Sequence, residues 1–111
     1  MHLDIYPKDT ICVKRKKIVA VVSGKKYVFK LSEIEEIILI VKRNENNQNE
    51  FSLGIRIDEK TSILLLSLHA LYNKFLYTDL KAVLPIDYNS VAMAELSEEK
   101  KIYSIYKRDV E

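Results

Sequence analysis

Hydrophobic and polar residues alternate with a period of two along much of the N-terminal part of the chain, and this pattern predicts β-strands. The clearest case runs from Phe51 to Ile57, where every second residue is apolar. Ser23-Gly24 is typical of a tight hairpin turn, because glycine tolerates a positive φ. The expected strands, about five or six, cover residues 10–16, 18–22, 26–31, 37–41, 51–57 and 61–66.

Two local signals interrupt these strands. Ser32 to Glu35 has the S-x-x-E form of a capping box, which predicts a single helical turn. The polar, asparagine-rich run from Asn44 to Asn49 predicts a loop. The apolar run 37–41 between these signals is therefore expected to be a short buried strand.

The hydrophobic period lengthens to that of an amphipathic helix over residues 68–84, and Pro85 ends it because the residue before a proline disfavours helical backbone. A second helix is predicted at about 97–109, with Ser97 as its N-cap and basic residues in its last turn. The apolar stripe of this second helix consists of Ile102, Tyr103, Ile105 and Tyr106.

This order of elements predicts an α+β fold that is mainly antiparallel β. The expected architecture is a bent sheet or barrel, closed by the helix at 68–84 and followed by the C-terminal helix. A chain of 111 residues has the length of one domain. Within it we expect a β domain with its capping helix at 1–90 and a helical extension at 91–111.

Two stretches resemble the bacterial pleckstrin-homology-like family. They are KKYVFKLSEIEEIILI, with its S-E-I corner between two strands, and SILLLSLHALYNKFLYTDLKAVLP, a strand followed by a closing helix. The resemblance covers about residues 10–85 and does not include 86–111. It implies a seven-stranded, orthogonally bent barrel whose helix at 68–84 closes one end. It also implies a non-enzymatic role in binding lipid headgroups, peptides or proteins.

Composition narrows the choice of partner and compartment. Charged residues make up 31% of the chain, yet the net charge is +2, so no overall field favours nucleic acid or an acidic membrane. The single cysteine, Cys12, excludes an intramolecular disulfide. No signal peptide is evident, and the runs 37–41 and 63–66 are far shorter than the roughly 20 residues that cross a bilayer. We therefore expect a cytoplasmic protein without a transmembrane segment.

Residues capable of catalysis are few. His2 lies near the N-terminus, and His69 is expected on the polar side of the helix start, as a solvated side chain. Cys12 lies within an alternating strand and is expected to be a small buried hydrophobe. The chain has two glycines and no phosphate-cradling motif. We expect no enzyme activity, no metal site and no cofactor.

A basic cluster is the most site-like feature of the sequence. It consists of Lys14, Arg15, Lys16, Lys17, Lys25 and Lys26. Several ammonium groups and a guanidinium that converge can hold a multiply charged anion. The favoured interpretation is a solvated sheet edge, because lysines on an edge strand protect it from pairing with other chains. Nucleic-acid binding is the least favoured, since Tyr103 and Tyr106 share a predicted face with isoleucines and are expected to pack against protein.

These features favour a non-catalytic interaction module whose partner is another protein or a second copy of the chain. The stripe of Ile102, Tyr103, Ile105 and Tyr106 either lies in a groove of that partner or docks on the chain's own sheet. Binding of an anionic lipid or of nucleic acid through residues 14–17 is the second interpretation. A toxin-neutralising or phage-encoded accessory protein fits the size and chemistry equally well.

Overall fold

The computed structural model describes residues 1–43, 45–46, 48–97 and 100–108. Its strands are β1 (His2–Ile5), β2 (Thr10–Lys14), β3 (Lys17–Val22), β4 (Lys25–Lys30), β5 (Glu36–Arg43), β6 (Asn49–Arg56), β7 (Ser62–Leu66) and β8 (Lys101–Lys107). The helical segments are the 3-10 turn η1 (Leu31–Glu33), α1 (Tyr72–Lys74), the π-helical turn η2 (Phe75–Asp79) and α2 (Tyr88–Leu96).

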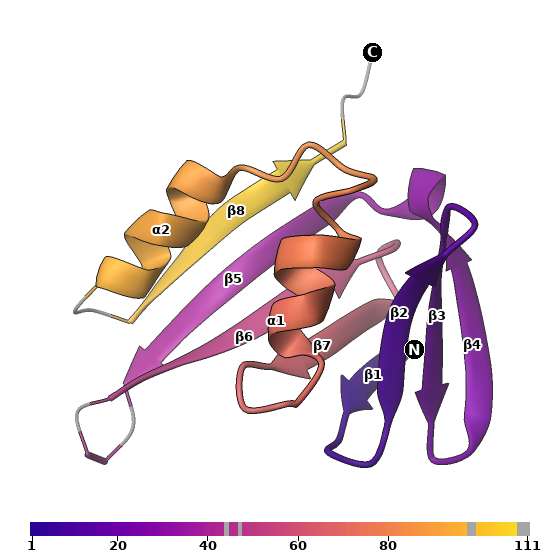
Figure 1. The fold of residues 1–111 in the computed structure, drawn as a ribbon, viewed down its shortest axis with the longest axis horizontal. Coiled ribbons are helices and arrows are strands. Elements are labelled where there is room, and N and C mark those ends of the chain that lie inside the picture. Colours follow the sequence, from indigo (N-terminus) through magenta and orange to yellow (C-terminus); the bar gives the residue numbers. More distant parts are fainter. Residues whose placement is uncertain (44, 47, 98–99, 109–111) are drawn as a thin grey trace.

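The strands form two sheets, which confirms a mainly antiparallel α+β fold (Figure 1). The large sheet has the order β1-β7-β6-β5-β8, and the small sheet has the order β2-β3-β4. All pairs are antiparallel except β1 with β7, which is parallel. Within the described residues the two sheets do not join into a closed barrel. The strand β1 was not among those predicted.

Two hairpins of minimal length build the small sheet. Lys14 pairs with Lys17 and Val22 pairs with Lys25, so each turn contains two residues. All four turn residues have positive φ: Arg15 52°, Lys16 61°, Ser23 53° and Gly24 80°. These are type I′ turns, whose twist matches that of the strands. Only Gly24 adopts such a φ freely, and a left-handed backbone costs other residues about 1–2 kcal/mol each.

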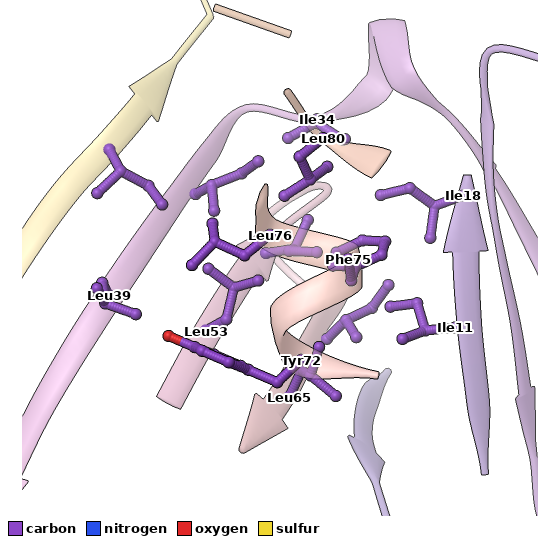
Figure 2. Close-up of a cluster of buried hydrophobic side chains, with 14 of the residues drawn as sticks. Ile11, Ile18, Ile34, Leu39, Leu53, Leu65, Tyr72, Phe75, Leu76 and Leu80 are labelled. Atoms are coloured by element: carbon purple, nitrogen blue, oxygen red, sulfur yellow. The ribbon is translucent and has the colours of Figure 1, made fainter. Parts of the chain in front are cut away.

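The hydrophobic core lies between the two sheets and is filled by the helical segment at 72–80. Figure 2 shows Phe75 pointing toward Ile11 and Ile18 of the small sheet, with Leu53 and Leu65 of the large sheet nearby. All five side chains are at most 1% exposed. Leaving water contributes roughly 1.5–3 kcal/mol for each large side chain of this kind. The core thus joins both sheets into one unit.

The predicted helix at 68–84 is confirmed in position but is shorter than expected, because regular helix covers Tyr72–Asp79 alone. Leu80 donates its amide to the Phe75 carbonyl at 2.9 Å, which is a π-helical bond between residues five apart. Leu68, which the apolar pattern placed on the core-facing side, is 82% exposed. It lies in the turns between β7 and α1, before the helical geometry begins.

The helix predicted at 97–109 is wrong over its described part, residues 97 and 100–108, because residues 101–107 form β8. Residues 98, 99 and 109 lie outside the described residues. The strand completes the large sheet by pairing with β5, with a register shift between Ile37 and Ile38. Ser97 does not begin a helix but follows the end of α2. The N-cap of α2 is Asp87, whose carboxylate accepts the Ser90 amide at 3.1 Å.

The helix α2 packs against the core side of the large sheet. α2 contributes the buried residues Val91 and Ala94, and it packs on β5 and β8. Both helices therefore cover the same face of the large sheet (Figure 1). Within the part of the chain that the structure describes, no helix has the length and apolar character that crossing a membrane requires.

Candidate functional site

The second face of the large sheet carries apolar side chains that no helix in the described part of the chain covers (Figure 1). β5 and β7 contain the continuous apolar runs 37–41 and 63–66, so they present hydrophobic side chains on both faces. Runs of this kind are typical of strands that are buried on both sides, whereas β6 alternates as a half-solvated strand does. Here the outward-facing Leu66 is 47% exposed and Ile102 is 60% exposed.

The outward residues of three strands form a shallow trough. Its floor is β6, where Ser52 and Gly54 are small, and its walls stand on the neighbouring strands β5 and β7. The apolar trough, as we name it, comprises Ile38, Ile40, Ser52, Gly54, Leu64 and Leu66. An open hollow of about 260 Å³ lies over the part of the trough formed by Ile38, Ile40, Gly54 and Leu64. A Cβ atom on Gly54 would lie 3.0 Å from Cγ1 of Ile38, so this glycine keeps the floor low.

One end of the trough is polar. Arg56 contacts the carboxylates of Glu35 at 3.3 Å and Glu36 at 3.6 Å. The Ser104 hydroxyl donates to Glu36 at 2.9 Å, and on the other side His2 and Ser62 share a hydrogen bond of 2.6 Å. The Arg56 side chain is 51% exposed, so its pairing with the two partly exposed glutamates contributes little to stability. These polar groups give the trough a hydrogen-bonding end that carries charges of both signs.

The four predicted partner-binding residues are divided between the two faces of the sheet. Ile105 is 1% exposed in the core, and Tyr103 and Tyr106 are half-buried against it. Ile102 alone of the four points outward, where it pairs in register with Ile40 beside the trough. The tyrosines and Ile105 therefore dock on the chain's own core, and Ile102 extends the exposed apolar surface.

No protein-family model, curated protein or solved structure matches this chain. Its function is therefore inferred from its own residues.

The predicted basic cluster is also divided. Lys14, Arg15, Lys16 and Lys17 lie together at the β2–β3 turn, and Lys26 lies on the same outward face of the small sheet. Lys25 lies at the opposite end of the hairpin, about 17 Å along the strand, with its Nζ 5.3 Å from the centre of the Tyr27 ring.

Lys30 joins this group and was missed. It pairs with Lys17, which in turn pairs with Lys14, so three lysines form one row across the small sheet. The sequence contains the necessary signal, because a two-residue turn at Ser23-Gly24 fixes the register of 17 against 30. We define the basic face as Lys14, Arg15, Lys16, Lys17, Lys26 and Lys30.

The prediction of a solvated His69 is wrong, because this side chain is 7% exposed. It lies in the turn before α1, where Nδ1 accepts the Leu71 amide at 3.0 Å. Nε2 therefore carries the proton and donates to the Asp9 carbonyl at 2.9 Å. The Asp9 carboxylate accepts the amides of Ser23 and Tyr6, and these bonds lower the pKa of Asp9. These hydrogen bonds of Asp9 and His69 join the β1–β2 connection to the start of the helix, and we call them the bracket. Their role is structural.

Other groups with chemical potential are dispersed. Cys12 is half-buried on the outward face of the small sheet, not fully buried as expected. Burial and the neighbouring Glu95 raise the pKa of Tyr77 to about 12. Among the residues that the structure describes, no three His, Cys, Asp or Glu side chains are grouped to hold a metal ion. The two surfaces with an evident binding chemistry are the apolar trough and the basic face.

Proposed function

We propose that this protein is a non-catalytic interaction module that binds a second copy of itself through the outward face of the large sheet. The observation that supports this most strongly is the uncovered apolar trough, whose two walls, β5 and β7, have the composition of strands covered on both faces. Exposed apolar patches of this kind mark interaction sites on otherwise polar surfaces.

The shape of the face favours a second copy as the occupant. Strand β6 forms a low floor, and the adjacent β5 forms a ridge with Ile38 and Ile40. We place a two-fold axis between the two facing sheets, parallel to the strands and midway between β5 and β6. Rotation about this axis brings β5 of each copy over β6 of the other, so that each ridge faces a floor. Sheets stacked in this way pack about 10 Å apart with interdigitating side chains.

The charges on the face are compatible with self-association. At one end Glu36 lies beside Arg56, and at the other Lys42 pairs in register with Glu50, so each end carries both signs. The β8 edge of the large sheet is less suitable for pairing with a second copy. β8 carries lysines at both ends, and such residues on an edge oppose strand-to-strand association.

The available area sets the expected affinity. Five strands at about 4.8 Å spacing and about six residues in length give roughly 500 Å² per copy, or about 1,000 Å² in a dimer. That is the lower limit for a specific protein interface, so the dimer should be weak and concentration-dependent.

Sedimentation velocity over protein concentrations from about 10 μM to about 1 mM tests this proposal. We expect the mass to rise from monomer toward dimer. Leu66→Lys places a charge in the trough and should hold the protein monomeric throughout the range. Leu96→Lys, at the exposed end of α2, introduces the same charge away from the face and should dimerise like the unmodified chain.

A monomer at every concentration would overturn self-association, as would equal dimerisation of both lysine variants. A different protein that binds the unmodified chain but not Leu66→Lys would then be the occupant of the trough. The pleckstrin-homology-like relationship is a separate prediction, which neither outcome decides.

A further inference from the structure

The small sheet concentrates the positive charge of the chain. Residues 10–30 contain seven of the 18 lysines and arginines and none of the 16 aspartates and glutamates. The rest of the chain is therefore net acidic, and the net charge of +2 conceals a strong separation of the two signs. The expectation against nucleic acid relied on that net charge and on the predicted packing of Tyr103 and Tyr106, and neither ground applies to a local patch on the small sheet.

The fold brings six of these seven cations together on the basic face. Lys14, Lys17 and Lys30 occupy adjacent strands in one row, about 4.8 Å apart. Like charges placed directly opposite each other oppose sheet formation. None of the six takes part in an ion pair found among the described residues. The Glu33 carboxylate lies beside this row and accepts the backbone amide of Lys30 at 3.3 Å.

The turn at the end of this row carries cations where the backbone disfavours them. Arg15 and Lys16 both have left-handed φ in a type I′ turn, a geometry for which Asn-Gly is the preferred pair. The following turn in the same sheet does place a glycine, Gly24, at its second position. Strained backbone persists where a function requires the side chain. Protection of the edge strands β2 and β4 explains Lys14, Lys26 and Lys30, but it explains neither the Arg15-Lys16 turn nor Lys17 on the central strand.

The surroundings of the basic face identify the kind of anion. The outward residues between the cations are Cys12, Val19 and Val28, so no aromatic platform is available for stacking single-stranded bases. Neither turn of the small sheet carries an apolar side chain that could insert into a membrane. Open hollows of about 320 Å³ and 590 Å³ lie on the face and beside the turn. An extended backbone of phosphates matches this open row of flexible ammonium groups better than a small enclosed ligand does.

We propose that the basic face binds the sugar–phosphate backbone of double-stranded nucleic acid, without reading its sequence. Lys14, Lys17 and Lys30 contact successive phosphates, and the Arg15-Lys16 turn extends the contact beyond the sheet. This inference is independent of the proposed self-association, because the two surfaces belong to different sheets.

Titration of a fluorescent duplex of about 20 base pairs at several salt concentrations tests the proposal. With three or four phosphates contacted, we expect a dissociation constant on the order of 10 μM at low salt and a log–log salt slope between about −2.7 and about −3.6. Lys14→Gln with Lys17→Gln should weaken binding at least about tenfold and reduce the slope by about two. Lys60→Gln with Lys100→Gln removes the same charge elsewhere and should change the affinity less than about twofold.

A second variant separates binding from folding. Arg15→Asn with Lys16→Gly gives the turn its preferred residues, so the protein should remain folded while duplex affinity falls at least about tenfold. Equal losses in the control pair would overturn the proposal, as would duplex affinity unchanged in both basic-face variants. Absence of salt-dependent duplex binding would also overturn it. Binding to vesicles with anionic lipid, but not to the duplex, would assign the face to a membrane surface instead.

Discussion

Replacing the Arg15-Lys16 turn by Asn-Gly should stabilise the fold, and the gain can be worked out from the backbone. A left-handed φ costs a non-glycine residue about 1–2 kcal/mol, and both turn residues have one, at 52° and 61°. Asparagine tolerates this region better than arginine does, and glycine adopts it freely. Glycine also makes the unfolded chain more flexible, which lowers the stability of the fold by about 0.5–1 kcal/mol. The net gain should be about 1 kcal/mol in the free energy of unfolding.

Urea denaturation and thermal melting measure this gain. The urea midpoint should rise with an unchanged slope, and for a chain of 111 residues about 1 kcal/mol corresponds to a melting temperature roughly 4 °C higher. Ser23→Asn in the neighbouring turn is the matched control, because Gly24 already relieves that turn and the gain there should be smaller. If Arg15→Asn with Lys16→Gly leaves the midpoint unchanged or lowers it, the turn is not strained, and the case for a functional demand on its cations is lost.

Two further predictions concern the bracket between the β1–β2 connection and the helix. Hydrogen bonds from Ser23 and Tyr6 lower the pKa of Asp9 below its usual value of 3.8. The ionised carboxylate therefore stabilises the fold above about pH 4. This contribution should disappear as the pH falls through the lowered pKa. Asp9→Asn should therefore flatten the acid side of a plot of stability against pH, and an identical acid limb in both proteins would refute this role. His69→Ala leaves the Asp9 carbonyl and the Leu71 amide without partners and should cost roughly 1–3 kcal/mol in urea denaturation. His2→Ala, at an exposed position, is its control, and equal small losses in both variants would show that His69 is not a structural link.

The strands between residues 10 and 66 were predictable because each carries a local signal, either a period-two pattern, as over 51–57, or a short apolar run, as over 18–22 and 37–41. The two-residue turn at Ser23-Gly24 was sufficient to fix the register that places Lys30 beside Lys17, but this pairing was not predicted. The continuous runs 37–41 and 63–66 indicated burial on both faces, which led to the expectation of an interior strand. Which of those faces stays uncovered depends on where the helices pack, and local sequence does not encode this.

The C-terminal strand could not be predicted because its pattern fits two structures. Ile102, Tyr103, Ile105 and Tyr106 form a helical stripe, but Tyr103 and Ile105 are also two apart on one face of a strand. The register shift at Ile37 then brings Tyr106 to the core side as well. The open edge of β5 decides between these structures, and this edge is a tertiary feature formed by residues far away in the sequence. His69 was misjudged for a similar reason, since its partner Asp9 is 60 residues distant.

The pairing of β8 with β5 also bears on how the chain folds during synthesis. β5, β6 and β7 can pair as soon as residue 66 has left the ribosome, but the remaining edge of β5 has no partner until residues 101–107 emerge. During that interval an edge rich in isoleucine is open to other nascent chains. Contacts between strands so distant in sequence also slow folding. Synthesis at a pace that shortens this exposed stage, or a chaperone that shields the edge, should therefore raise the yield of folded protein.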